Sequence, residues 1–467
     1  MKICAIILLL VTAAESFLNC TYSLNHITYQ CDLTIINPNG LNNFTEIGGV
    51  HLENFTNDEV TRLLVMRNAD SISTNVPSII CATFPNLAWI ELTTIGLTEI
   101  GDDDIASCSQ LVRLRLGSNN IRAISGNALM RLAGLEEISF GRNNLTTLPE
   151  NVFVNQINLQ RLDLQFNPLD TIPDGLLQPL EKLDTFFITS IDEVKSQWFV
   201  NTRLQTLWVT DSRVAALPDS FIGLENVRTF LFINNEISEI RSGGFSGLTK
   251  LEVLYLNGNK LTELQADTFL GLKNLIHLFV SNNPIELINE NAFRGLDSLS
   301  TLNMEVCRLR QIQSNSFHHL PRLTSISLSI NQIEELPEGV FSAFDLRSIS
   351  VSQNQLQSLH RNSFGSLRNL DWFAVGSNNI QAVNATIIDD AVRLNNFFFF
   401  DNSCASFSSR DFVANRTELL PELKDCFDNY ETLLIQQPMV MGKQQPSLQL
   451  KRSGRDHNLG YLVHPVK

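Results

Sequence analysis

A pattern of leucines that recurs about every 24 residues constrains this chain more than any other feature. Residues 251–274, LEVLYLNGNKLTELQADTFLGLKN, show it clearly, with apolar residues at Leu251, Leu254, Leu256 and Leu261 and with Asn259 just before the last. Fourteen copies begin in one frame at Leu87, Leu111, Leu135, Leu159, Leu183, Leu204, Val227, Leu251, Leu275, Leu299, Leu323, Leu346, Leu370 and Leu394. Such a period indicates one elongated array rather than several ordinary domains.

The spacing L-x-x-L-x-L-x-x-N-x-L is typical of a leucine-rich repeat. We therefore predict an α/β repeat fold, a leucine-rich repeat solenoid shaped as a curved horseshoe. A parallel β-sheet should line its concave face, and irregular or 3-10 arcs should form its convex face. No repeat can bury its apolar side alone, so stability should come from the interfaces between neighbouring repeats.

The ninth position of each repeat is the point where the chain turns off its strand. An asparagine side chain there can donate to and accept from buried backbone groups, and ten repeats have one: Asn119, Asn143, Asn167, Asn235, Asn259, Asn283, Asn331, Asn354, Asn378 and Asn402. Cys307 occupies this position in its repeat and is predicted to be buried and free, the alternative being an intermolecular disulfide. The asparagine is missing at Ile95, Ile191 and Ser212, so the curvature should change locally near residues 183–212.

Phenylalanines recur in the second half of most repeats. We predict that they form a stacked apolar spine under the convex side rather than a ligand site. They are Phe153, Phe221, Phe245, Phe269, Phe293, Phe317, Phe341 and Phe364.

The ends of the array need caps, because a terminal strand would otherwise expose its edge and core to water. We predict a signal peptide over residues 1–16, an amino-terminal cap with one degenerate repeat over 17–86, the array over 87–402, a carboxyl-terminal cap over 403–430 and a disordered tail over 431–467. Six cysteines permit fifteen pairings. From their proximity along the chain we predict Cys20–Cys31, Cys81–Cys108 and Cys404–Cys426.

The composition of the two ends points to an extracellular protein. Lys2, the apolar run 3–14 and the small residues Ala14 and Ser16 resemble a secretory signal. Sequons for N-glycosylation occur at Asn43, Asn54, Asn144, Asn384 and Asn415. No apolar stretch is long enough to span a membrane. The net charge of −15 argues against nucleic acid and anionic membrane surfaces as partners.

No motif of an enzyme accompanies the repeats. The sequence lacks G-x-S-x-G, H-E-x-x-H, a P-loop and a dinucleotide fingerprint, and its histidines do not have metal-ligand spacing. We therefore expect neither catalysis, nor a cofactor, nor a bound metal.

Recognition should use the concave face, where positions three, five, seven and eight of each repeat point outward. Position five is large and apolar in five successive repeats, which we call the aromatic stripe: Phe187, Trp208, Leu231, Tyr255 and Phe279. Ile233 and His277 flank it. Charged residues concentrate nearer the amino terminus, at Arg113, Arg115, Glu137, Arg142, Arg161 and Asp163.

An exposed apolar patch of this size usually marks a binding surface. Three readings stay open: contact with a ligand or partner, cover by the tail or by a second copy in a homodimer, and no role. A second patch comprises Trp372, Phe398 and Phe400, for which packing under the carboxyl-terminal cap is an equal alternative. None of the sequons falls on a concave position.

The array resembles the 24-residue class of extracellular leucine-rich repeats found in Toll-type receptors, Slit-type guidance proteins and small proteoglycans. The segments YQCDLTIINPNGLNNFTEIGGVHLENF and VPSIICATFPNL resemble insect secreted leucine-rich proteins, including the mosquito leucine-rich immune proteins. This resemblance implies an innate-immunity role in haemolymph, through contacts with pathogens or complement-like proteins. The chain departs from the better-known members because residues 427–467 show no heptad coiled coil and the cap has two cysteines, not four.

The sequence thus predicts a secreted, glycosylated, coil-less recognition protein that binds a protein or a pathogen-surface molecule. An adhesion or scaffold role in matrix or neural tissue, or a subunit that stabilises a secreted enzyme, are the alternatives.

Overall fold

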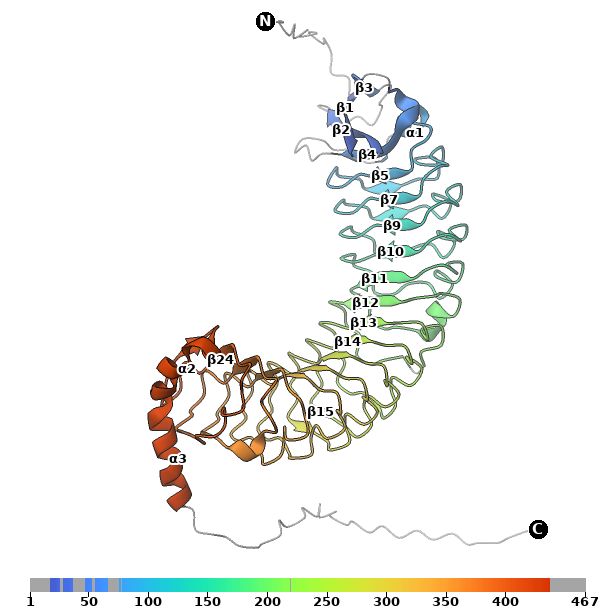
Figure 1. Ribbon diagram of the computed structural model, residues 1–467. Helices are drawn as coiled ribbons and strands as arrows, with labels where there is room; N and C mark the ends of the chain where they lie inside the picture. The colour runs from blue at the N-terminus through green and yellow to red at the C-terminus, as the bar shows by residue number, and fades with distance from the viewer. Residues whose placement is uncertain are drawn as a thin grey trace, which may run out of the picture.

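The structure is a computed structural model that describes residues 17–25, 28–36, 47–52, 55–65, 75–76, 78–218 and 220–436. The predicted signal peptide, the sequons Asn43 and Asn54 and the tail from residue 437 onward lie outside the described residues. Within them the chain forms a long curved solenoid, with its two ends on the same side of the arc (Figure 1).

One parallel sheet runs through the solenoid, because each repeat contributes a short strand in register with the next. Its strands lie along the inside of the curve, while the arcs that carry η2 (Ser196–Phe199) and η3 (Arg361–Ser363) lie outside (Figure 1). The repeat strands are β5 (Trp89–Glu91), β7 (Arg113–Arg115), β9 (Glu137–Ser139), β10 (Arg161–Asp163), β11 (Thr185–Thr189), β12 (Thr206–Thr210), β13 (Thr229–Leu231), β14 (Val253–Tyr255), β16 (His277–Phe279), β18 (Thr301–Asn303), β19 (Ser325–Ser327), β20 (Ser348–Ser350), β22 (Trp372–Ala374) and β24 (Asn396–Phe398). The predicted solenoid is confirmed.

The hydrogen bonds of Asn259 show why the ninth position is an asparagine. Its Nδ2 donates to the carbonyl oxygens of Phe232 at 2.7 Å and Leu256 at 2.9 Å, and its Oδ1 accepts from the Ile237 amide at 3.1 Å. One side chain thus satisfies three backbone groups of two repeats in a buried site. Cys307 is buried and free as predicted, and its Sγ lies 3.7 Å from the Val280 carbonyl oxygen.

The residue before the ladder position turns the chain off its strand with a left-handed backbone. It has a φ between 49° and 67° in the non-glycine examples Thr94, Ser118, Arg142, Phe166, Ser190, Asp211, Asn234, Asn282, Val306, Ile330, Gln353, Ser377 and Asp401. In the repeat that starts at Leu251 this residue is Gly258, where a Cβ would lie 2.2 Å from Oδ1 of Asn234. Val306 and Ile330 are strained here, because β-branched residues disfavour positive φ.

The phenylalanine spine is present in the convex half of the coils. From Phe221 to Phe364 the neighbouring ring centroids lie 5.8–6.1 Å apart, one repeat after another. Three two-stranded parallel sheets flank this core, formed by β6 (Glu99–Ile100) with β8 (Ala123–Ile124), β15 (Glu263–Leu264) with β17 (Leu287–Ile288), and β21 (Ser358–Leu359) with β23 (Ala382–Val383).

The geometry of the array changes where the ladder asparagines are missing. Strands β11 and β12 pair over five residues, whereas the pairs before and after them cover three. The short arc between them forms η2, in which Trp198 and Phe199 are buried. Figure 1 shows a nearly straight column from β5 to β11 and a stronger curve beyond β12, as expected for this region.

The amino-terminal cap is a hairpin of β1 (Phe17–Asn25) and β2 (Thr28–Ile36), with β3 (Ile47–Gly49), η1 (Asn57–Glu59), β4 (Val60–Val65) and α1 (Ile79–Thr83). Strand β4 pairs in parallel with both β2 and β5, so the hairpin covers the first edge of the repeat sheet. Cys20 and Cys31 form a disulfide in the hairpin, and Cys81 in α1 is bonded to Cys108. Both predicted pairs are confirmed.

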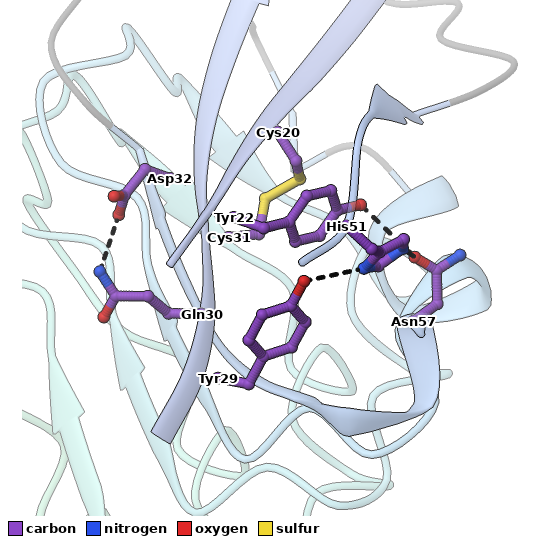
Figure 2. Close-up of a disulfide and its surroundings, with 8 residues drawn as sticks. All are labelled: Cys20, Tyr22, Tyr29, Gln30, Cys31, Asp32, His51 and Asn57. Carbon is purple, nitrogen blue, oxygen red and sulfur yellow. Dashed lines mark hydrogen bonds between the residues drawn. A yellow bond between two sulfur atoms is a disulfide. The ribbon is translucent and has the colours of Figure 1, made fainter. Parts of the chain in front are cut away.

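A polar and aromatic cluster fixes the rest of this cap (Figure 2). The His51 ring stacks on Tyr22 with centroids 3.9 Å apart, and its Nδ1 lies 3.1 Å from the Tyr29 hydroxyl. Its Nε2 lies 2.8 Å from Oδ1 of Asn57. Burial, together with the neighbouring Tyr29, raises the pKa of Tyr22.

The carboxyl-terminal cap consists of β25 (Ser408–Ser409), α2 (Phe412–Leu419), η4 (Leu420–Leu423) and α3 (Lys424–Gln436). Strand β25 pairs antiparallel with β24, and the Cys404–Cys426 disulfide ties α3 to the last repeat, as predicted. Pro421 is the second residue of η4, the short turn between the two helices. Helix α3 continues to Gln436, so the first six residues of the predicted disordered tail are helical, which corrects that boundary.

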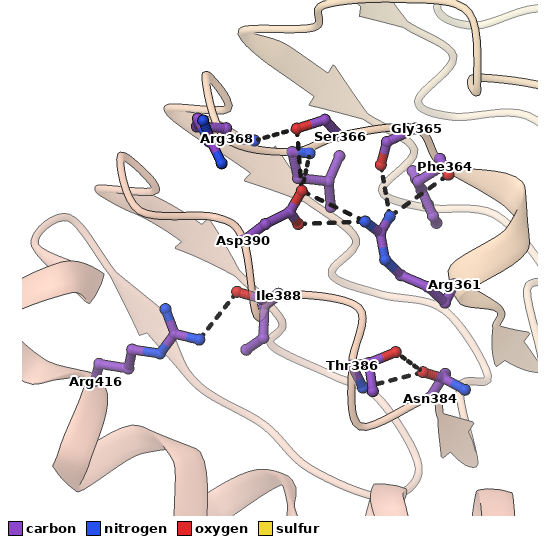
Figure 3. Close-up of polar contacts among 11 residues, drawn as sticks. Arg361, Phe364, Gly365, Ser366, Arg368, Asn384, Thr386, Ile388, Asp390 and Arg416 are labelled. Carbon is purple, nitrogen blue, oxygen red and sulfur yellow. Dashed lines mark hydrogen bonds and ion pairs between the residues drawn. The ribbon is translucent and has the colours of Figure 1, made fainter.

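Figure 3 shows polar contacts at this end of the array, one between α2 and a repeat and the others within the last repeats. Arg416 Nη2 donates to the Ile388 carbonyl oxygen at 3.0 Å, and Arg361 Nη2 lies 3.4 Å from the Asp390 carboxylate. In the sequon at Asn384, the Oδ1 atom accepts from the Thr386 amide at 3.0 Å and from its hydroxyl at 2.6 Å.

Candidate binding face

The parallel register brings the five residues of the aromatic stripe together on neighbouring strands of the concave face. Phe187 on β11 is paired with Trp208 on β12, and the alignment continues without a shift through Leu231 and Tyr255 to Phe279 on β16. Because the strands are hydrogen-bonded neighbours, about 4.8 Å separates successive members. The predicted juxtaposition therefore exists in the fold.

The stripe is less exposed than the contiguous exposed patch that the sequence predicts. The side chains of Phe187 and Leu231 are only 5% and 7% exposed, and those of Trp208, Tyr255 and Phe279 are half-buried. Aromatic rings at this strand spacing contact one another and cover the smaller groups between them. The surface available to a partner is thus provided by three residues, with the half-buried Ile233 and His277 beside them.

Two ring pairs organise this surface. Phe187 and Trp208 meet edge to face with centroids 4.9 Å apart, and Tyr255 and Phe279 stack in parallel at 4.4 Å. The His277 ring stacks near Phe279 at 6.4 Å. Rings held in this way lose little conformational freedom on binding, which favours them as interface anchors.

Two polar atoms beside the stripe have no hydrogen-bond partner within the described part of the chain. They are Nε1 of Trp208 and Oδ1 of Asn257, both buried. An unsatisfied buried donor or acceptor costs free energy, about 1–3 kcal/mol by typical values.

A cluster around Trp89 was not identified from the sequence. The guanidinium carbon of Arg62 lies 3.5 Å from the centre of the Trp89 ring, and those of Arg113 and Arg115 lie 5.0 and 5.1 Å from it. Such arrangements are cation–π contacts. Arg62 could not be assigned to this cluster from the sequence, because it belongs to the degenerate repeat, where the leucine frame is lost. It lies opposite Trp89 because β4 pairs with β5 in the sheet.

Carboxylates partly neutralise this cluster. Arg115 contacts both Glu137 at 2.7 Å and Glu91 at 3.7 Å, and the Arg113–Glu137 pair is longer, at 3.8 Å. The same pattern continues toward the stripe, because the Arg161 guanidinium carbon lies 4.4 Å from the ring centre of Phe187. The charged region and the aromatic stripe are therefore one continuous surface.

The second patch lies on the concave face at β22 and β24 and not under the cap. Trp372 is 39% exposed, and its ring lies 4.7 Å from that of Phe398. Phe400 packs over Gly376, where a Cβ would lie 2.8 Å from the ring. The packing under the cap uses other rings, namely Phe397, Phe399, Phe407 and Phe412.

The two apolar patches are separated by a polar stretch. The outward residues of β19 and β20 are all serines: Ser325, Ser327, Ser348 and Ser350. These side chains offer hydroxyl groups but little apolar area, so the aromatic stripe and the second patch form two contact regions on one face.

The three described sequons leave this face open. Asn144 and Asn415 are exposed and Asn384 is half-buried, and none of them lies on a strand of the long sheet. Within the part of the chain that the structure describes, no helix has the length and apolar character to cross a bilayer, and no three ligating side chains cluster around a potential metal position.

Two family comparisons cover the array. The Leucine rich repeat family matches residues 202–261, 249–309 and 305–356, and the family described as BspA type Leucine rich repeat region (6 copies) matches residues 74–206. Together they span residues 74–356, more than half of the chain. The protein therefore belongs to the leucine-rich repeat proteins. No curated protein sequence matches it at a significant level.

Solved structures with the same fold include Toll, TLR13 and APL1. Toll from Drosophila, solved with Spatzle, superposes with a TM-score of 0.62 at 21% identity, over 78% of this chain and 51% of Toll. TLR13, solved with a single-stranded RNA, gives 0.54 at 17% identity, over 77% and 57%. The APL1 leucine-rich repeat domain gives 0.52 at 17% identity, over 76% and 91%. This chain thus spans about half the length of Toll, and these likenesses establish the fold alone.

Proposed function

We propose that this protein is a secreted recognition protein that binds a protein or a pathogen-surface molecule through its concave face, in innate immunity. The observation that carries the proposal is the aromatic stripe, in which ring pairs are held in place on the inside of the curve. A soluble chain usually leaves so many large apolar side chains adjacent on one face only where a partner covers them.

The energetics favour a few anchors over a broad contact. Fully burying one large apolar side chain contributes roughly 1.5–3 kcal/mol. Trp208, Tyr255 and Phe279 are already half-buried, so a partner gains only part of this amount at each. Three such anchors still supply several kcal/mol together.

The extracellular setting is supported by the chemistry of the cysteines and by the fold. Three disulfides fasten the two caps, which is typical of proteins that leave the reducing cytosol. The immune setting is supported by structural likeness to Toll, whose complex with Spatzle is described as a hub in development and innate immunity. The sequence resemblance to mosquito leucine-rich immune proteins points the same way.

The proposal can be tested with the stripe variant, Trp208→Ser with Phe279→Ser. Immobilised wild-type protein and the variant would be incubated with insect haemolymph, and captured proteins compared by quantitative mass spectrometry. A matched control, Ile157→Ser with Val200→Ser, removes exposed apolar side chains from the outer arcs. Partners captured by the wild type and the control but lost with the folded stripe variant would support the proposal; retention of those partners would refute it.

Homodimerisation through the same face is the competing outcome. Light scattering with size-exclusion chromatography would reveal it as a doubled mass that the stripe variant abolishes. A wild-type protein that is monomeric at micromolar concentration leaves the face free for another molecule.

A further inference from the structure

Arginines outnumber carboxylates on the amino-terminal half of the concave face. On the strands β4, β5, β7, β9 and β10 of the long sheet and in the turns directly after them, the arginines among the described side chains are Arg62, Arg113, Arg115, Arg142 and Arg161. The carboxylates are Glu91, Glu137 and Asp163, so five positive charges face three negative ones. This excess of two occurs on a chain whose net charge is −15, which makes the region distinct from the rest of the molecule.

The carboxylates of this region are already engaged. Glu137 accepts from Nε and Nη2 of Arg115, both at 2.7 Å. Asp163 accepts from the Ser139 hydroxyl at 2.8 Å and from the Gln165 amide at 3.0 Å. Arg142 and Arg161 have no ion-pair partner within the described chain. The Arg113 side chain is 46% exposed, and its one ion pair among the described residues is the long contact with Glu137. Three guanidinium groups therefore keep most of their donors free.

Aromatic platforms hold two of these groups in place. The guanidinium carbon of Arg142 lies 4.2 Å from the Phe166 ring centre, and that of Arg161 lies 4.4 Å from that of Phe187. A guanidinium stacked on a ring keeps the donors at its edge available, and those donors match a carboxylate. Because Phe187 also contacts Trp208, the free donors of Arg161 lie directly beside the aromatic stripe.

We propose that the concave face recognises a polypeptide segment in which an acidic stretch adjoins an apolar one. The acidic stretch would lie over β7 to β10, against Arg113, Arg142 and Arg161, and the apolar stretch over β11 to β16. The apolar half rests on the function proposed above, whereas the acidic half rests on the arginines alone. A polyanion without apolar groups would leave the stripe uncovered, and the net charge of the chain would repel it beyond this small region.

The test uses a fluorescent peptide with a run of glutamates followed by leucines and phenylalanines. Control peptides replace the glutamates by lysines or by glutamines, or the apolar residues by serines. Binding to the full-length protein is measured by fluorescence anisotropy at low and at physiological salt. The basic-face variant combines Arg113→Gln, Arg142→Gln and Arg161→Gln. Its matched control, Arg122→Gln, Arg131→Gln and Arg203→Gln, removes three exposed charges away from the concave face.

The wild type and the control variant should bind the glutamate peptide at least about tenfold more tightly than the lysine or glutamine peptide. The basic-face variant should lose most of that preference and most of the salt dependence. Equal binding by the basic-face variant and its control, or no preference of the wild type for glutamates, would overturn the proposal. So would tighter binding of heparin or single-stranded RNA than of the peptide.

The two proposals fail in different ways. If the basic-face variant loses peptide binding and the stripe variant does not, the role of the aromatic stripe in binding is refuted and the role of the arginines is supported. Loss in the stripe variant alone would do the reverse.

Discussion

Arg161 on β10 lies across the ring of Phe187 on β11, with its guanidinium carbon 4.4 Å from the ring centre. Trp208 meets the same ring edge-on from the other side. Phe187 is therefore enclosed by two neighbours, which explains why its side chain is only 5% exposed although it points to the concave face. Its role is to support the residues on both sides, and the contacts with a partner fall to them.

This enclosure predicts the effect of Phe187→Ala. The change should lower the free energy of unfolding by about 3 kcal/mol, because it leaves a cavity between packed side chains. Chemical denaturation would measure it. The control is Tyr255→Ala, at a half-buried residue of the same stripe, which should lower the free energy of unfolding clearly less. Equal losses would mean that Phe187 is not a packing residue.

The ladder predicts a large effect from a small change at Asn259. Asn259→Ala should destabilise the array by roughly 2–4 kcal/mol, because three buried backbone groups lose their partner. Thermal unfolding followed by circular dichroism would show the loss. Asn257→Ala, two residues earlier and outside the ladder, should have a much smaller effect.

The strained turn at Ile330 predicts a stabilising substitution. Its φ is 57°, which costs a β-branched residue about 1–3 kcal/mol, and its side chain is 43% exposed. Ile330→Asn should raise the melting temperature, because asparagine tolerates this backbone. Ile330→Val keeps the branch at Cβ and should not raise the melting temperature. A lower melting temperature for Ile330→Asn would contradict the proposed backbone strain.

The thiol of Cys307 should be unreactive in the folded protein. Burial raises its pKa to about 11, so the thiolate is scarce at pH 8 and the group is covered as well. A thiol reagent should label it only after unfolding. The native state keeps a proton there that the unfolded state releases above pH 9, so this group lowers stability as the pH rises from about 9 to 11. Cys307→Ser should remove that part of the pH dependence.

The attachment of α3 should weaken in acid. His360 Nδ1 lies 2.9 Å from the Tyr430 hydroxyl, and burial lowers the pKa of the ring below 6.5. The ring binds a proton more readily in the unfolded state than in the folded state. The contribution of His360 to the free energy of unfolding is therefore complete above pH 6.5, and it is lost as the pH falls through the lower pKa of the folded state. Hydrogen exchange of the α3 amides should quicken below pH 6.5. A His360→Gln variant should show a weaker pH effect.

Much of the architecture could be predicted because the same repeat pattern occurs many times in the sequence. Fourteen copies fix the frame, the frame assigns each leucine, asparagine and phenylalanine to an inward position, and the strand register follows. The disulfides followed from proximity along the chain, since each pair closes a short loop near one end. The helical extent of α3 could not be predicted from a segment without any repeat.

The sequence by itself determined which residues face the concave side and that large apolar ones gather at β11 to β16, because strand alternation depends only on position within the repeat. Tertiary structure decided how much of each side chain a partner could reach. Phe187 is covered by Arg161 and by the Trp208 ring, and Leu231 lies between Trp208 and Tyr255 on the neighbouring strands. Exposure depends on such neighbours. The contact between Arg62 and Trp89 also depends on the tertiary structure, because β4 of the cap joins the sheet by backbone pairing that the repeat pattern does not predict.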